Sequence, residues 1–204
     1  MKPNPFQALP ESVEIAGCHI PIDADFRVGV AIETEAMEEN PDVVGLLKLF
    51  YKGEIPPDVE AAADRMVWFY AHHDGKEETE NAEDTKKGRR WYDFGQDADA
   101  LLASFLDAYG IDLATARLHW WVFRRLMFNL PPETPFMKRV HYRTADLKKL
   151  SKSEQKHYKK MRTLYAIKRD AEPAMTVEER EAALKEKMRR RYEEARKQME
   201  KAAP

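Results

Sequence analysis

The segment between Trp91 and Phe136 limits the possible folds most, because it concentrates the large aromatic side chains. Three of the four tryptophans lie in it. Its apolar residues recur three or four positions apart, which predicts helices that bury one face. Five residues carry this pattern and are expected in the core: Trp91, Phe94, Phe105, Trp120 and Trp121. An aromatic stripe of this kind is more often core than a binding platform.

Two helices are predicted in this segment. The first is capped by Asp93, three residues before Gln96, and ends at Gly110. The second is expected to cover residues 112–129, with an almost wholly apolar circumference and a place at the centre of the core. Only three residues give this second helix a polar edge: Arg117, Arg124 and Arg125.

A β-hairpin and three helices are predicted ahead of this segment. The hairpin joins residues 12–15 to residues 18–22 through Ala16-Gly17. Helical spacing of apolar residues then predicts helices at residues 26–37, 42–51 and 58–72. From residue 74 to residue 90 no aliphatic side chain is larger than alanine, so we expect a mobile acidic loop there.

Two further helices are expected after the turn at residues 131–135. One resumes at Phe136, and the other is a basic amphipathic helix opened by the capping pair Ser151 and Glu154. Beyond residue 173, a long charged helix is predicted from Thr176 onward, with a thin apolar seam. The seam residues are the candidates for binding a partner: Leu184, Met188, Tyr192, Ala195 and Met199.

The expected fold class is therefore mainly α: a compact helical domain with a small N-terminal β-hairpin and a long charged C-terminal helix. We expect an N-terminal arm at residues 1–11, the domain at residues 12–167 and a charged helical tail at residues 168–204. Cys18 is the only cysteine, which favours a reducing compartment. No apolar run is long enough for a secretory signal or a membrane span, so we expect no membrane contact.

The net charge of −2 hides a strong polarity along the chain. Residues 1–137 hold 13 Lys and Arg against 25 Asp and Glu, and residues 138–204 hold 21 against 11. This polarity is compatible with nucleic-acid binding, with an acidic protein partner or with attraction between copies of the chain. Glutamates are mixed through the basic tail, which favours a partner-seeking helix over a nucleic-acid arm.

No catalytic, cofactor-binding or metal-binding residues are predicted. The pair His72-His73 points in two directions on a helix and lacks a third ligand at a supporting interval. Asp93, Asp97 and Asp99 do not have calcium-loop spacing and instead suit the first turn of a helix. The only evident base beside Cys18 is its neighbour His19, whose side chain would point to the opposite face of a strand. An inert thiol is therefore favoured over a nucleophile.

Several motifs together resemble the bacteriophage gene-product-fifteen family over about residues 10–167. They are Trp91-Tyr92-Asp93-Phe94, Tyr109-Gly110-Ile111-Asp112-Leu113, Leu118-His119-Trp120-Trp121, Tyr142-Arg143 and Ser153-Glu154-Gln155-Lys156. The family occurs in tailed phages and prophages of Gram-positive hosts, next to the tape-measure gene. The resemblance carries no catalytic residues and does not extend over residues 168–204.

This resemblance implies a non-enzymatic tail assembly protein, a chaperone that acts with the tape-measure protein in the cytoplasm of the bacterial host. A structural component of the virion tail is the first alternative, and homo-oligomers are compatible with it. A nucleic-acid-binding phage protein that uses the basic C-terminal third is the second. No cofactor is expected in any of these cases.

Overall fold

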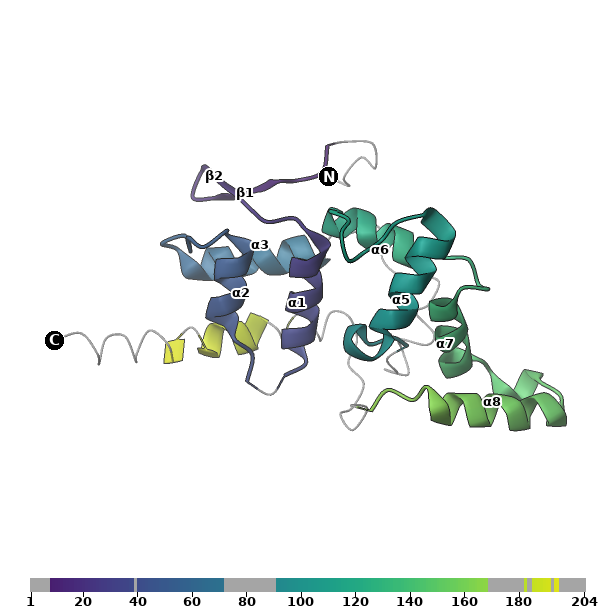
Figure 1. Ribbon diagram of the computed structural model, residues 1–204. Helices are drawn as coiled ribbons and strands as arrows, with labels where there is room; N and C mark the ends of the chain where they lie inside the picture. Colours follow the sequence, from purple (N-terminus) through teal and green to yellow (C-terminus); the bar gives the residue numbers. More distant parts are fainter. Residues whose placement is uncertain are drawn as a thin grey trace. The chain divides into compact units, whose positions relative to one another are not determined.

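The computed structural model of the chain describes residues 8–38, 40–71, 91–168, 182, 185–191 and 193–194 (Figure 1). Helices dominate and a two-stranded hairpin precedes them, so the predicted mainly α fold with an N-terminal hairpin is confirmed. The elements are β1 (Ser12–Ile15), β2 (Cys18–Pro21), α1 (Phe26–Ala36), α2 (Val43–Phe50), α3 (Val59–Ala71), α5 (Phe94–Tyr109), α6 (Trp120–Phe128), α7 (Pro135–Thr144), η1 (Leu147–Lys149) and α8 (Lys152–Leu164). Within the described part of the chain, no helix combines the length and the apolar character that crossing a bilayer requires.

The chain divides into two compact units, and each combines segments that are distant in the sequence. Unit 1 comprises Met1–Glu77, Arg117–Arg125 and Val177–Pro204. Unit 2 comprises Glu78–Ala116 and Leu126–Thr176. The limits of these units cut across the expected domain at residues 12–167, whose boundaries stay a prediction.

The hairpin of unit 1 turns at the predicted residues. Ile15 pairs with Cys18 in antiparallel fashion, and the turn between them places Ala16 and Gly17 at φ of 49° and 79°. Both central residues are left-handed, as a two-residue hairpin turn requires. Val13 and Ile15 are buried while the residues between them are exposed, so β1 presents one apolar face to the rest of the unit, where it contacts α3.

The first three helices of unit 1 begin and end close to the predicted residues. Asp25 and Asp42 cap α1 and α2 by accepting hydrogen bonds from backbone N–H groups of the first turn. α2 contacts both α1 and α3. The residues of these helices that are fully buried form the centre of the unit: Ile32, Phe50, Ala62, Met66 and Phe69.

The prediction of a helix over residues 112–129 is wrong for the first half of that range, because α6 begins only at Trp120. The backbone immediately before it is extended and pairs with the chain that enters α1. The N–H of Trp120 donates to the carbonyl of Ala24 at 2.8 Å, and the N–H of Phe26 donates to the carbonyl of Leu118 at 2.8 Å. These two long-range hydrogen bonds satisfy backbone groups that a continuous helix would have paired locally.

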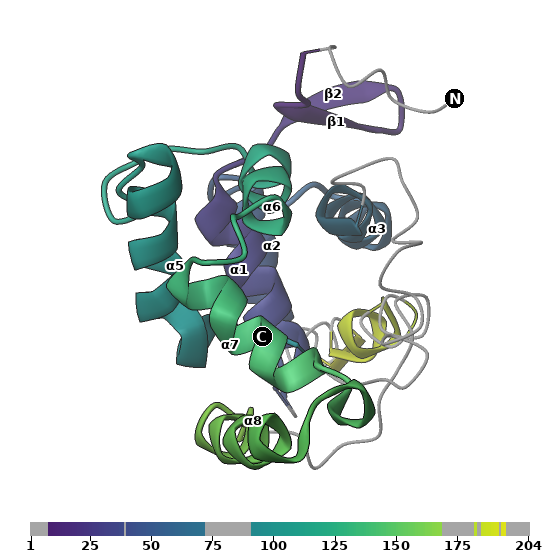
Figure 2. The same cartoon turned by 90° about the vertical axis from the view of Figure 1, so that its right-hand side faces the viewer.

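In unit 2, α7 packs against both α5 and α8 (Figure 2). Asp93 caps α5 as predicted, and Gly110 ends it at φ 67° in the left-handed conformation. α7 starts with Pro135 in its first turn, where the missing N–H costs nothing. Ser151 and Glu154 form the predicted reciprocal capping box at the start of α8.

Two predicted segments lie wholly or mostly outside the described residues. The acidic loop at residues 74–90 is one, together with His72 and His73. The long charged C-terminal helix is the other. Of the chain beyond residue 168, residues 182, 185–191 and 193–194 are described and are helical. A continuous helix from Thr176 stays a prediction.

Candidate functional site

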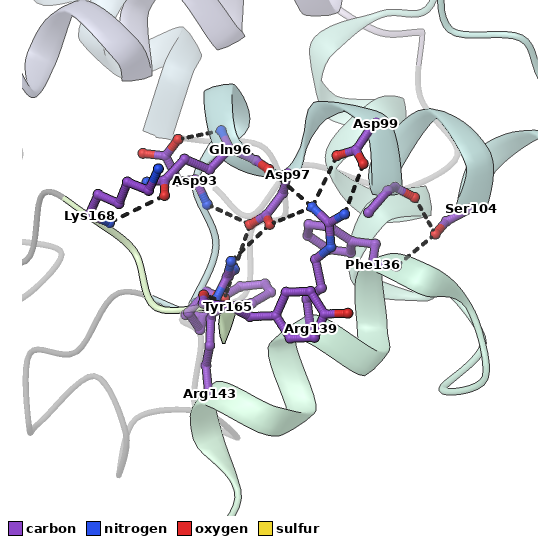
Figure 3. A network of polar contacts seen from close by, with 12 residues as sticks. Asp93, Gln96, Asp97, Asp99, Ser104, Phe136, Arg139, Arg143, Tyr165 and Lys168 are labelled. Atoms are coloured by element: carbon purple, nitrogen blue, oxygen red, sulfur yellow. Dashed lines mark hydrogen bonds and ion pairs between the residues drawn. The ribbon is translucent and has the colours of Figure 1, made fainter. Parts of the chain in front are cut away.

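Unit 2 contains a buried ionic cluster that joins α5 to α7. Asp97 is 1% exposed and faces the guanidinium groups of Arg143 and Arg139 (Figure 3). Arg143 donates to the two carboxylate oxygens at 2.5 and 2.9 Å, in the two-point geometry that strengthens such pairs. Asp97 also accepts the backbone N–H of Asp93 at 3.0 Å. Its carboxylate is therefore held by three partners.

Arg139 extends this cluster to the surface. It donates to both oxygens of Asp99, at 3.0 and 2.9 Å, and to the carbonyl of Gln96 at 3.0 Å. The hydrogen bonds that Arg139 donates to Asp99 lower the pKa of Asp99 below its ordinary value, and the same hydrogen bonds raise the pKa of Arg139. With its groups paired to one another, the cluster is suited to holding two helices together rather than to reacting with a substrate.

A second set of polar contacts fixes the start of α7. The buried hydroxyl of Ser104 donates to the carbonyl of Ala100 at 2.6 Å and accepts the backbone N–H of Phe136 at 3.0 Å (Figure 3). The chain beyond α8 is tied to the same region, because Arg143 donates to the carbonyl of Tyr165 at 2.6 Å. These contacts make α7 a rigid wall for the cavity beside it.

That cavity has a volume of about 480 Å³ and lies entirely in unit 2. The volume falls within the range of about 300–1,000 Å³ that is usual for ligand pockets. Its lining residues come mainly from α7 and are Trp91, Phe128, Pro132, Met137, Lys138, Val140, His141, Tyr142, Thr144 and Tyr158. Among its described lining residues, Lys138 and His141 can carry a positive charge and none is a carboxylate.

Three polar side chains of the cavity lining already form hydrogen bonds within unit 2. Nε2 of His141 and the hydroxyl of Tyr158 form a hydrogen bond of 3.0 Å at an exposed position. The hydroxyl of Thr144 donates to the carbonyl of Val140 and so is already engaged. Aromatic and aliphatic walls with one lysine beside them favour binding of a partner's apolar side chain that has a negative charge next to it.

The residues expected in the core divide between the two units. Phe105, Trp120 and Trp121 are 0%, 0% and 5% exposed. Trp120 and Trp121 lie in unit 1, where their indole N–H groups donate to the carbonyls of Tyr70 at 3.0 Å and Phe69 at 2.8 Å. Two members of the set are only half-buried: Trp91 and Phe94. Trp91 lines the cavity, against Phe128.

The sequence predicts that Arg124 lies on a polar edge of α6, but in the structure this side chain is buried. It is 6% exposed, and its Nη1 lies 3.6 Å from the carboxylate of the buried Glu33. The hydroxyl of Tyr70 donates to the same carboxylate at 3.0 Å. The charge of Arg124 is thus paired inside unit 1, which a pattern of apolar spacing cannot reveal because it treats every arginine as solvated.

Of the predicted partner-binding residues, only Met188 is described, and it is buried at 1% exposure. The segment around it belongs to unit 1. Lys185 forms an ion pair of 3.3 Å with Asp64, and Lys187 donates to the carbonyl of Glu38 at 3.2 Å. The other four candidates, Leu184, Tyr192, Ala195 and Met199, lie outside the described residues.

Other chemistries find little support in the residues that the structure describes. Among them, no three or more His, Cys, Asp or Glu side chains are grouped so that they could hold a metal ion. Cys18 is a free, exposed thiol in β2.

Fold and cavity together describe a mainly helical protein with a largely apolar cavity. The chain matches the family described as Bacteriophage Gp15 protein over residues 6–167. It belongs to that bacteriophage protein family, as the motifs around Trp91 and Trp120 suggested. No curated protein and no solved structure matches the chain.

Proposed function

We propose that this chain is a non-enzymatic assembly protein of a bacteriophage tail, a chaperone that binds the tape-measure protein before or during polymerisation of the tail tube. The observation that carries the proposal is the family match over residues 6–167. The resemblance of the motifs adds the expected setting beside a tape-measure gene. Its place of action is then the cytoplasm of the bacterial host.

The C-terminal segment supports binding to a helical partner. A tape-measure protein exposes long helices with apolar stripes, and such helices bind in apolar grooves or against other amphipathic helices. Met188 is an adaptable side chain of this segment. It is buried in unit 1, but the ion pair beside it joins Lys185 and Asp64, which are 51% and 59% exposed and therefore contribute little. A partner helix can replace this ion pair at low cost, and must also cover Met188 again where it displaces the segment.

Co-expression of the chain with the tape-measure protein tests the proposal. The tape-measure protein should become soluble and co-purify with the chain. Leu184→Glu, which places a charge in the apolar seam, should reduce the amount retained several-fold. Gln198→Glu introduces a negative charge outside the five seam residues and serves as the matched control, with retention unchanged. A tape-measure protein that stays insoluble, or never co-purifies, would count against the chaperone function.

A structural component of the virion tail is the second candidate, and the charge polarity of the chain favours it. Residues 1–137 carry an excess of 12 negative charges, and residues 138–204 an excess of 10 positive charges, so that copies attract one another. Mass spectrometry of purified phage particles separates the two functions. A structural component is present in stoichiometric amount, whereas a chaperone is absent from the finished particle.

A further inference from the structure

The exposed face of α5 combines two leucines with negative charge. Leu102 and Leu106 are 38% and 58% exposed, and their spacing of four residues places them side by side on the helix. Asp99 and Asp107 are exposed close to them. Of the three aspartates of α5, Asp97 is buried and Asp99 is paired with Arg139, so Asp107 supplies the negative charge beside this apolar ridge.

The opposite face of α5 is already used. Ala100, Leu101, Ser104 and Phe105 are buried, and the helix contacts α7 on that side. The ridge formed by Leu102 and Leu106 therefore has no role in the packing of its own helix. Single exposed leucines are common on protein surfaces, so the ridge alone does not identify a binding site.

The cavity of unit 2 supplies the complementary surface. Its walls are largely aromatic and aliphatic, and the described lining residues include Lys138 and His141 but no carboxylate. An apolar ridge with Asp107 beside it matches this cavity both in hydrophobicity and in charge. In a single copy the two surfaces do not meet, because Leu102 and Leu106 remain exposed.

We propose that the Leu102–Leu106 ridge of one copy binds in the cavity of a second copy, with Asp107 beside Lys138. The two surfaces are different, so the contact is head-to-tail. Such contacts close into a ring or continue as a chain of copies, according to the rotation between neighbours. The contact stands independently of the proposed chaperone function. Because the interface is small, association is weak and depends on concentration.

Sedimentation velocity of the full-length chain over a wide dilution series tests this contact. The average mass should rise above that of the 23.8 kDa monomer as the concentration increases. Leu106→Glu should abolish the rise. Leu164→Glu is the matched control, because Leu164 is 66% exposed on α8 and lies outside both surfaces. Circular dichroism should show the same helix content and melting temperature for both variants.

Exchanging the charges of Lys138 and Asp107 tests whether these two residues face each other across the contact. Lys138→Glu alone and Asp107→Lys alone should each lose self-association, because like charges then face each other across the contact. An equimolar mixture of the two variants should recover it, because opposite charges face each other again. Lys152→Glu, a change on the exposed surface of α8, should leave association intact.

Three outcomes overturn the proposal. One is a monomer at every concentration, and another is self-association that Leu106→Glu and Lys138→Glu leave unchanged. The third is a chain that stays monomeric while its cavity binds an acidic amphipathic helix of the tape-measure protein in a manner sensitive to Lys138→Glu. In that case the cavity binds a different partner.

Discussion

Arg143 and Asp97 form an ion pair inside unit 2, with both carboxylate oxygens bonded and with exposures of 6% and 1%. Removing one partner of a buried pair leaves the other charge without compensation, at a cost of about 3–5 kcal/mol. We therefore expect Asp97→Ala to lower the free energy of unfolding by about that amount, measured by urea denaturation. Asp99→Ala is the control. Its carboxylate is exposed, so the loss should stay below about 1 kcal/mol. Equal losses would show that the buried pair has no special role.

Gly29 of α1 lies directly against the indole of Trp120. A Cβ placed on Gly29 would overlap the ring, which is itself fully buried and cannot move aside easily. Gly29→Ala should therefore destabilise the protein by about 1–3 kcal/mol, the usual cost of overpacking. In an open helical position the same change stabilises by about 0.8–1 kcal/mol.

Gly95→Ala provides the control for this prediction. Gly95 is exposed in the first turn of α5, and an added Cβ would come no closer than 3.3 Å, to Oδ1 of Asp93. Its effect on the melting temperature should be small or favourable. A Gly29→Ala variant as stable as the Gly95→Ala variant would contradict the close packing of α1 on Trp120.

His119 should make the stability of unit 1 depend on pH. Its Nδ1 accepts the backbone N–H of Trp121 at 3.1 Å, and Nε2 lies 3.1 Å from the carbonyl of Pro10 and donates to it. The contact at Nδ1 requires the neutral ring, and burial lowers the pKa of His119 below its ordinary value. The unfolded chain binds the proton more readily, with a pKa of about 6.5.

The sign of the effect follows from this difference. The contribution of His119 to stability is complete above about pH 6.5 and is lost as the pH falls toward the lower pKa of the folded state. Chemical denaturation between neutral and mildly acidic pH measures it. His119→Gln should flatten this pH dependence, whereas His157→Gln, at an exposed position of α8, should retain it. An unchanged slope in the first variant would exclude His119 as the source.

Trp120 and Trp91 should respond very differently to truncation. Trp120 is fully buried and its indole donates a hydrogen bond, so Trp120→Ala should cost about 3–5 kcal/mol. Trp91 is half-buried at the cavity, and Trp91→Ala should cost clearly less while enlarging that cavity. Thermal unfolding of both variants measures the difference. A stable Trp120→Ala variant that no longer retains the tape-measure protein would instead make Trp120 a binding residue.

The helices that the sequence predicts well are those with a local signal at each end. α5 has Asp93 at its start and Gly110 at its end, and α8 has its capping box. These signals act within a few residues and do not depend on the rest of the fold. The same reasoning failed at Asp112, whose side chain accepts the N–H of Ala114 in a short turn. There the pairing of residues 118–120 with residues 24–26 prevails over local helix formation.

The candidate site was harder to predict from the sequence than the helices were. Asp97 reads as an ordinary first-turn carboxylate, and its partner Arg143 is 46 residues away. The cavity likewise combines Trp91 and Tyr158, which lie in separate predicted elements. Pairings of this kind depend on how the helices pack, and apolar spacing along one helix contains no information about its neighbour.

The division of the chain into two units also determines when the core of unit 1 can form during synthesis on the ribosome. The core of unit 1 needs Trp120 and Trp121, but these residues follow α5 in the chain. α3 ends at Ala71, so at a synthesis rate of about 5–20 residues per second its partners emerge several seconds later. During that interval the nascent α1, α2 and α3 expose apolar surface that the finished protein hides. We expect this surface to be covered once Trp120 and Trp121 have emerged from the ribosome.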